Sequence, residues 1–382
     1  MTIRKFDVVV VGAGAAGLMT AQKLSQLGMS VALIEQKPTV ASGPSTRNEG
    51  WLHRGTYHAA SIRDRSSALQ VAQRCIYGHE QLKTFAPEAI EDSDKKPIAM
   101  LKNGERLDDL LSRWTEAGIR YKEISHRAVA SLVPGIDVTR AAALFEVNDV
   151  SINTRLLYRK LVGTAQVSGC VIFVAHKIVR CDNLTLELEG VNGEILRISG
   201  QRIVYTTGAG TKSLFATLHN VEIPIRYWKS HLLVTKRLAP MGVFYLDAHE
   251  AAMMHHGDVS IIGFNEDAAL CDAPGYEVIP ERAGNLRKGI GRIIPSWRDT
   301  PAVDIACVKV DLVEQGDAAR SLNVAIREPV PGHIVALPGK LTETPYLADA
   351  LVAMIHNDVE DKLISDRPCD RYAAASLLSE AL

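Results

Sequence analysis

The chain has 382 residues, of which 47% are hydrophobic and 23% charged, and its formal net charge is −1. This length can bury a core large enough for two domains, and the balanced charge lacks the basic excess typical of nucleic-acid-binding proteins. No apolar run approaches the roughly 20 residues that a membrane-spanning helix needs, and the six cysteines lack the C-x-x-C spacing of a zinc site or disulfide framework.

The first predicted strand begins at Phe6 and leaves no room for a signal peptide, so we expect a cytoplasmic protein. It runs into a G-x-G-x-x-G motif at Gly12, Gly14 and Gly17, followed by a helical pattern and a second strand that ends at Glu35. Gly12 permits the sharp turn, Gly14 lets the backbone approach a pyrophosphate, and Gly17 lets the helix pack on the strand. This order predicts a dinucleotide-binding βαβ unit; an ordinary βαβ turn without a ligand is the alternative.

Two segments supply the expected dinucleotide contacts. The helix N-terminus favours phosphate, and the acid at the strand end can accept hydrogen bonds from ribose hydroxyls. The expected contacts there are Gly12, Gly14, Ala15, Ala16, Gly17, Glu35, Gln36 and Lys37.

The loop over 45–58 mixes hydrogen-bond donors, glycines and aromatic side chains, which is typical of a cofactor pocket. Its expected contacts are Ser45, Thr46, Arg47, Asn48, Glu49, Gly50, Leu52 and His53, although Arg47 could also meet a substrate anion or solvent.

Hydrophobic periodicity predicts the remaining elements. Helices are expected over 64–85, 107–117, 153–167, 280–294 and 346–363, and strands over 98–101, 171–174, 184–188, 194–198 and 201–207, with short strands between 225 and 279. The pattern predicts an α/β fold in which a β-rich substrate domain interrupts a Rossmann-like nucleotide domain. The expected boundaries are 1–90, 149–224 and 326–382 for the nucleotide domain, and 91–148 and 225–325 for the substrate domain.

The loop also carries a more specific pattern, Ser-x-x-Asn-x-Gly-x-x-His-x-Gly-x-Tyr, at Ser45, Asn48, Gly50, His53, Gly55 and Tyr57. With it, the chain resembles the D-amino-acid-oxidase-type superfamily of FAD enzymes, and within it the L-2-hydroxyglutarate oxidase or dehydrogenase branch. Further landmarks lie in order at 132–136, 206–210 and 257–264. The resemblance implies FAD with its isoalloxazine between the two domains, accepting a hydride at N5 from a carbon that bears a hydroxyl or an amine. It also implies cofactor contacts at Thr207 and Gly208.

Two departures from the family pattern concern the flavin and the substrate. The family has a glycine-rich turn beside the flavin, whereas segment 337–344 contains a single glycine. The expected cofactor contacts in this segment are Gly339, Lys340, Leu341 and Thr342. Lys309 stands where family members often use an arginine to hold the substrate carboxylate, and Arg327 is nearby in sequence. The substrate can therefore differ from 2-hydroxyglutarate.

Several side chains are candidates for catalysis. Lys340 would stabilise negative charge on the reduced flavin, or would simply be solvated. His53 could be a covalent flavin tether, a noncovalent pocket residue or a helix cap. His231 is a candidate base because its ordinary pKa is near neutrality, and Lys229 on the same side of the predicted strand could bind a carboxylate or lie near N5. His256 competes for the base role.

We therefore expect an FAD-dependent oxidoreductase that oxidises a C–OH bond of a small, carboxylate-bearing substrate such as a 2-hydroxy acid. The expected substrate contacts are Lys229, His231, His256, Lys309 and Arg327. An amine or amino-acid oxidase, a nicotinamide dehydrogenase and a nucleotide-binding protein without catalysis are the alternatives. The electron acceptor, oxygen or a carrier, stays open, and the sequence indicates no metal site.

Overall fold

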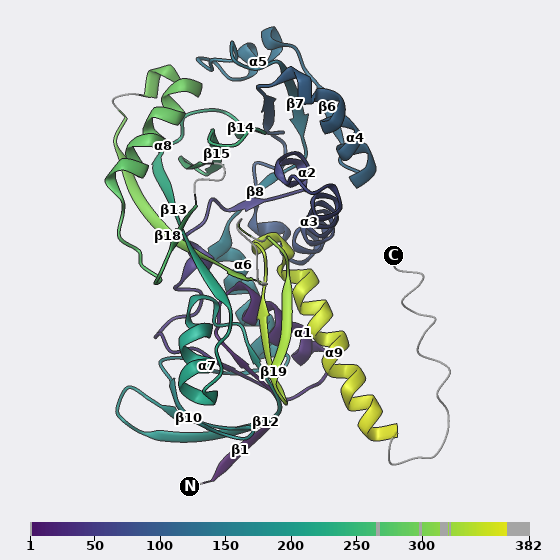
Figure 1. Ribbon diagram of the computed structural model, residues 1–382, viewed down its shortest axis with the longest axis vertical. Coiled ribbons are helices and arrows are strands. Elements are labelled where there is room, and N and C mark those ends of the chain that lie inside the picture. The colour runs from purple at the N-terminus through teal and green to yellow at the C-terminus, as the bar shows by residue number, and fades with distance from the viewer. Residues whose placement is uncertain (1, 265–267, 298–299, 314–319, 321, 365–382) are drawn as a thin grey trace.

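The computed structural model describes residues 2–264, 268–297, 300–313, 320 and 322–364 (Figure 1). In this part of the chain, two large sheets occupy opposite halves of the molecule, and a small sheet lies between them. This is the mixed α/β architecture expected from the sequence. The last predicted stretch of the nucleotide domain, 365–382, lies outside the described residues, and the domain boundaries stay predictions.

The first large sheet carries the glycine motif. Within the described residues its strands are β1 (Ile3–Val11), β2 (Val31–Ile34), β9 (Val171–Phe173), β10 (Lys177–Asp182), β11 (Thr185–Glu189), β12 (Ile195–Tyr205), β19 (Ala325–Val330) and β20 (His333–Leu337). β1 pairs in parallel with β2 and β12, β2 with β9, and β12 with β20. The carboxyl ends of these parallel strands meet at one edge, which is where open α/β sheets bind their ligands.

One strand of this sheet is longer than expected. The hydrophobic pattern predicts separate strands at 194–198 and 201–207, but the structure has the single strand β12 from Ile195 to Tyr205. Ser199 and Gly200 stay in register with Lys5 and Phe6 of β1. The two small residues interrupt the apolar pattern without interrupting the backbone ladder.

Helices cover both faces of the first sheet. They are α1 (Ala15–Gln26), α6 (Thr154–Val167), α7 (Thr211–His219) and α9 (Thr344–Ile364). Val8 and Val10 of β1 pack in one core cluster with Leu18 of α1, whereas Val9 packs in another cluster with Phe215 of α7. Because side chains alternate along a strand, β1 is buried on both faces, which explains its uninterrupted run of valines.

The second large sheet is built from two separate stretches of the chain, 98–147 and 225–312. Its described strands are β5 (Ile98–Leu101), β6 (Tyr121–Glu123), β7 (Ala143–Val147), β13 (Ile225–Lys236), β14 (Val243–Tyr245), β15 (Ala251–His256), β16 (Val259–Phe264), β17 (Ala269–Cys271) and β18 (Ala302–Leu312). The helices α4 (Leu107–Ala117), α5 (His126–Leu132) and α8 (Pro280–Ile293) belong to this half (Figure 1). β13 and β18 form a long antiparallel pair in which Trp228 lies opposite Lys309 and Ser230 opposite Cys307.

The small sheet contains β3 (Trp51–Leu52), β4 (Ile90–Glu91) and β8 (Val150–Ile152), and α2 (Thr56–Ser61) and α3 (Arg65–Phe85) lie beside it. α3 packs tightly on the short 3₁₀ helix η6 (Leu341–Glu343). The contact is so close that a Cβ on Gly78 would lie 1.7 Å from the Thr342 carbonyl oxygen. None of the described helices has the length and apolar character needed to cross a membrane. The cytoplasmic location stays a prediction.

Candidate active site

The turn after β1 has the geometry that its glycines predict. Gly12 has φ +96°, and a Cβ there would lie 2.8 Å from the Thr206 carbonyl oxygen. A Cβ on Gly17 would lie 1.9 Å from the Gly12 carbonyl oxygen and 2.6 Å from Thr206 Oγ1. Only glycine lets α1 pack this closely on the turn. Gly14 precedes the helix with extended backbone angles, and a Cβ there would lie 3.0 Å from Ser45 Oγ.

Glu35 lies at the end of β2 and faces this turn. Its carboxylate accepts hydrogen bonds from the N–H groups of Ala13 at 3.0 Å and Lys37 at 2.9 Å. These bonds fix the carboxylate in the wall of a cavity, where its remaining lone pairs can accept from hydroxyl groups. We call Gly12, Gly14, Gly17 and Glu35 the glycine cradle.

The loop after β2 closes the cradle from another side. Ser45 Oγ accepts the N–H of Ala15 at 3.0 Å, which ties the loop to the first turn of α1. The Asn48 side chain donates to the Ser45 carbonyl at 2.7 Å and accepts from the Gly50 N–H at 2.8 Å. The Tyr158 hydroxyl of α6 donates to the same Ser45 carbonyl at 2.7 Å. These contacts hold the loop in one shape.

The cradle and the loop line a cavity of about 1400 Å³. Pockets for drug-sized ligands are typically about 300–1,000 Å³, so this larger cavity has room for a dinucleotide. Its wall also includes parts of β13 and β18 and the turn after β20. The expected site residues that line it are Gly12, Gly14, Ala15, Ala16, Glu35, Gln36, Lys37, Ser45, Asn48, Glu49, His53, Thr207, Gly208, Lys309, Gly339, Lys340 and Leu341.

Another part of the wall carries basic side chains and imidazoles, which we call the charged cluster: His53, His58, Lys309, Arg320 and Lys340. The rings of His53 and His58 meet edge to face, with centroids 4.5 Å apart. Burial, and then the nearby Lys340 ammonium, lowers the pKa of both histidines well below its usual value of 6.5. Both rings are therefore neutral at pH 7 and can accept a proton.

Asp149 is a buried acid beside His53. Its carboxylate accepts hydrogen bonds from Trp51 Nε1 at 3.0 Å, from the Arg54 N–H at 3.0 Å and from the Thr56 hydroxyl. Burial raises the pKa of Asp149, and these hydrogen bonds oppose that shift. Asp149 Oδ1 lies 3.9 Å from His53 Nδ1, close enough to stabilise a proton on that nitrogen.

The turn after β20 contains a buried ion pair. Lys340 Nζ donates to Glu343 Oε2 at 3.2 Å, and the Glu343 side chain is fully buried. Glu343 Oε1 has no hydrogen-bond partner among the described residues. Burial raises the pKa of the Glu343 carboxyl, and the Lys340 charge opposes this. Glu343 thus balances part of the Lys340 charge, which the sequence analysis did not foresee.

The side of β13 that faces the cavity is not the side that the sequence analysis expected. Trp228 and Ser230 line the cavity, whereas Lys229 and His231 alternate with them along the strand and lie outside its lining. Both of the latter contact the 277–279 segment: Lys229 Nζ lies 3.3 Å from a carboxylate oxygen there, and His231 Nε2 accepts a backbone N–H at 2.9 Å. The structure therefore does not bring these two predicted residues into the site.

His256 and Arg327 also lie outside the cavity lining. His256 Nδ1 is 2.5 Å from Glu91 Oε2, and its Nε2 donates to the Glu49 carbonyl at 2.8 Å. Its ring fills the space beside Gly50, where a Cβ would lie 2.3 Å from the ring. His256 therefore supports the loop after β2. Arg327 is exposed and lies on the antiparallel hairpin β19–β20.

The other expected cofactor residues lie behind or beside the wall. They are Gly17, Thr46, Arg47, Gly50, Leu52 and Thr342. The Arg47 guanidinium stacks 4.5 Å from the ring centroid of Tyr276, which does line the cavity. Thr342 Oγ1 accepts the His53 N–H at 3.2 Å and so joins the turn after β20 to the loop after β2.

Sequence reasoning missed several residues of the site. His58 is one position beyond the Tyr57 of the recognised pattern, so the pattern could have suggested it. Trp228 and Ser230 stood in the recognised strand, but nothing in the sequence says which side of that strand faces the cavity. Arg320 and Asp149 carried no local signal at all.

The residues present fit a flavin dinucleotide. The cradle allows close backbone approach, and Glu35 offers a carboxylate to hydroxyl groups. Trp228 Nε1 and Ser230 Oγ are buried beside the cavity and have no hydrogen-bond partner among the described residues, so both are available to a bound polar group.

Comparisons with known proteins agree with this geometry. The chain is 24% identical to para-nitrophenol 4-monooxygenase from Pseudomonas sp. (strain WBC-3), over 95% of this chain and 82% of that protein. It shares its fold with glycine oxidase from Geobacillus kaustophilus, at a TM-score of 0.72 and 18% identity, covering 93% of this chain and 95% of that one. L-alpha-glycerophosphate oxidase from Mycoplasma pneumoniae, with FAD bound, gives a TM-score of 0.74, 17% identity and the same two coverages. The sequence profile of the DAO family, FAD dependent oxidoreductase, matches residues 7–338, so the chain belongs to this family of FAD-dependent oxidoreductases.

Proposed function

We propose that this oxidoreductase oxidises the C–OH bond of a small, carboxylate-bearing substrate, such as a 2-hydroxy acid. Bound FAD supplies the hydride acceptor for this reaction. The glycine cradle, the loop after β2 and the turn after β20 would hold it. The observation that carries the substrate class is the set of cationic side chains in the charged cluster.

Lys309 is the group that we assign to the substrate carboxylate. It projects from β18 on the same side of the sheet as Trp228 and Cys307, and it lines the cavity. Among the described residues it has no ion-pair partner, and its charge contributes to lowering the pKa of the nearby His53. An unbalanced ammonium in a partly buried wall favours an anionic ligand. Lys309 also stands at the position expected for the arginine with which family members often hold the substrate carboxylate.

His53 is the group that we assign to the substrate hydroxyl proton. Its ring is neutral at pH 7, lines the cavity and shares the cluster with Lys309. The proton would pass from the hydroxyl oxygen to the imidazole, and the Asp149 carboxylate 3.9 Å from Nδ1 would stabilise the resulting cation. His231, the other candidate base named above, lies outside the cavity lining.

An amine or amino-acid substrate is the second candidate. The Glu49 carboxylate lines the same cavity and would attract a substrate ammonium group. The names of the similar structures include both a glycine oxidase and an L-alpha-glycerophosphate oxidase, so the fold supports either chemistry. Glu343 and Asp311 pair with Lys340 and Arg320 of the charged cluster, and the carboxylate assigned to Lys309 is common to both substrate classes. We place the hydroxy acid first because the neutral His53 ring can take the proton of a hydroxyl group.

The test is anaerobic bleaching of the FAD-loaded protein with matched pairs of compounds. Each 2-hydroxy acid is compared with the amino acid of the same carbon skeleton and with its own methyl ester. We expect reduction by one or more 2-hydroxy acids, with the ester much slower because it lacks the carboxylate. Reduction by amino acids alone would establish the second candidate, and equal rates for acid and ester would remove the role of Lys309.

A further inference from the structure

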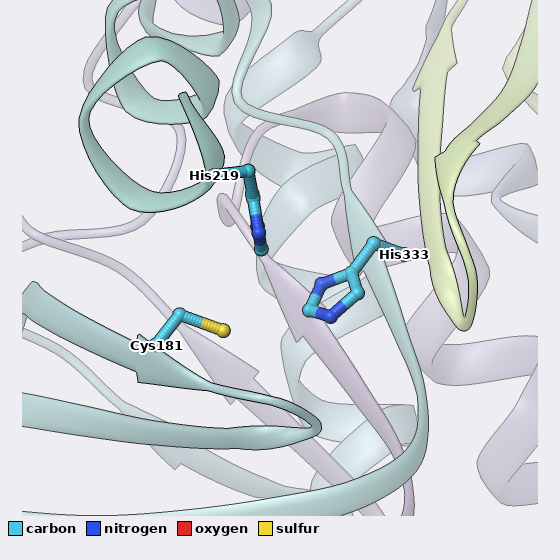
Figure 2. Close-up of side chains that lie close together, drawn as sticks. All are labelled: Cys181, His219 and His333. Atoms are coloured by element: carbon cyan, nitrogen blue, oxygen red, sulfur yellow. The ribbon is translucent and has the colours of Figure 1, made fainter. Parts of the chain in front are cut away.

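Outside the cavity, one cluster of side chains has the composition of a metal site. Cys181 of β10, His219 at the end of α7 and His333 at the start of β20 come from distant parts of the chain and point toward one another (Figure 2). Their possible ligand atoms lie within 4.8 Å of one another, and within the described residues no other group of this kind is found. None of the three lines the cavity.

The hydrogen bonds of His333 show which of its nitrogens is available. Its Nε2 lies 3.1 Å from the Asn183 carbonyl oxygen, which can only accept, so the ring proton is on Nε2. Nδ1 then carries a lone pair on the side of the cluster, 3.1 Å from the Tyr205 hydroxyl. An imidazole whose outer N–H is held by a carbonyl is the arrangement that orients metal-bound histidines.

His219 and Cys181 complete the set from the other two sides. His219 Nε2 lies 3.3 Å from the same Tyr205 hydroxyl, and the two imidazole rings have centroids 4.4 Å apart. Cys181 Sγ lies 3.1 Å from the Asn183 carbonyl oxygen, so one backbone carbonyl contacts both the thiol and His333.

We propose that Cys181, His219 and His333 bind a divalent transition-metal ion of the zinc class. Two imidazole nitrogens and one sulfur are donors that Zn²⁺ accepts and that Ca²⁺ and Mg²⁺ do not. The Cys181 thiol would lose its proton to solvent on binding, and a water molecule or the Tyr205 hydroxyl would take the fourth position. Small side-chain shifts would bring the three donors to the roughly 2.0–2.3 Å that zinc requires.

The ion would act as a cross-link within the first sheet. It would join the β10–β11 hairpin, the end of α7 and the strand β20, which follow one another at wide intervals in the sequence. Without an ion, the Tyr205 hydroxyl can bridge the two imidazoles by hydrogen bonds alone. The experiment must therefore separate a metal site from a hydrogen-bonded cluster.

The experiment uses the full-length, FAD-loaded chain without a histidine tag, after treatment with a chelator. Zn²⁺ is titrated calorimetrically, and Co²⁺ is added separately to look for the absorption of a thiolate-bound tetrahedral ion. We expect one equivalent of Zn²⁺ per chain with a Kd of about 1 μM or below, a higher Tm with Zn²⁺, and a cobalt spectrum that includes sulfur ligation.

Two ligand variants and two matched controls make the result specific. Cys181→Ser and His219→Gln should each weaken Zn²⁺ binding by about 100-fold or more, whereas Cys271→Ser and His176→Gln should leave it unchanged. Flavin reduction by substrate should be unchanged in the Cys181, His219 and Cys271 variants, because none of these three residues lines the cavity. No stoichiometric binding by the wild-type chain, a cobalt spectrum without sulfur ligation, or full binding in either ligand variant would overturn the proposal.

Discussion

The glycine cradle and the charged cluster belong to one cavity but are built from different parts of the polypeptide. The cradle is made mainly of backbone. At Gly12 and Gly17 the neighbouring backbone lies too close to leave room for a Cβ. The Glu35 carboxylate is held by two backbone N–H groups. The charged cluster is made of side chains from separate elements. Burial, and then the charges of Lys340 and Lys309, lowers the pKa values of His53 and His58.

This difference separates two kinds of recognition. A backbone cradle fits a ligand whose shape does not change, such as the nucleotide half of a cofactor. Side-chain charges can be replaced without changing the fold, so they set which small molecule is bound. Changes in the cradle should therefore remove the cofactor, whereas changes in the charged cluster should alter rate, substrate and pH dependence with the cofactor still bound.

The largest effect is expected for Gly17→Ala. The new Cβ would lie 1.9 Å from the Gly12 carbonyl oxygen, so α1 must move away from the turn. We expect FAD binding to fall by about 100-fold or more, together with a lower Tm. Flavin content after purification and a thermal melt measure both. Gly163→Ala in α6 is the control, because a Cβ there meets nothing within 4 Å. Full flavin occupancy in the Gly17 variant would contradict the cradle.

The next effect concerns the base. His53→Asn should lower the rate of flavin reduction by about 100-fold or more, which is typical for removal of a general base. His231→Asn, which changes a histidine outside the cavity lining, should keep the rate. Because burial lowers the pKa of His53 below 6.5, the acid limb of the wild-type pH–rate profile should also lie below pH 6.5. Rapid-mixing measurements of flavin absorbance across pH give both the reduction rates and the pH–rate profile. A large loss of rate in the His231 variant alone would assign the base to His231 instead of His53.

Acid should lower the free energy of unfolding through His79 of α3, which lies behind the loop after β2. This buried residue has Nδ1 3.3 Å from the Leu52 carbonyl oxygen, and burial lowers its pKa to about 4 from 6.5. The unfolded chain then binds the proton more readily, so stability is lost as pH falls below 6.5. At pH 5 the cost is of order 2 kcal/mol. His79→Gln should lose less stability than the wild type between pH 7.5 and pH 5, as measured by urea unfolding; equal losses would contradict this.

The smallest effect is expected for the Lys340–Glu343 pair. If Lys340 stabilises the reduced flavin, Lys340→Met should lower the flavin potential and Glu343→Gln, which leaves the ammonium unbalanced, should raise it. A shift of roughly 30 mV corresponds to about 1.4 kcal/mol for a two-electron couple. Lys229→Met and Glu277→Gln break an ion pair outside the cavity lining and serve as controls. Shifts of the same sign in both cavity variants would argue against a charge effect.

The sequence indicated the cradle well and the charged cluster less completely. Gly12, Gly17 and Glu35 follow from local backbone requirements, and these are visible in a short stretch of sequence. On β13 the strand was recognised, but choosing between its two sides needs the register with β18, in which Trp228 lies opposite Lys309. An error of one residue in this register assigns to the cavity the side chains that in fact point to the opposite face of the strand.

Buried charges were the other gap. Asp149 and Glu343 look like surface acids in the sequence, and only packing shows that their side chains are fully buried. The cluster of Cys181, His219 and His333 is assembled across the sheet, so no short motif could reveal it. Long-range contacts of this kind depend on the tertiary fold.

The most direct test of the account compares Lys309→Met with Lys229→Met. The two lysines lie on adjacent paired strands, but only Lys309 lines the cavity. The measurement is the Kd of the reducing 2-hydroxy acid, from anaerobic flavin reduction at increasing substrate concentration. We predict that Lys309→Met raises this Kd roughly 10- to 100-fold with FAD fully bound, and that Lys229→Met leaves it unchanged. An unchanged Kd in the Lys309 variant, or an equal rise in both, would contradict the account.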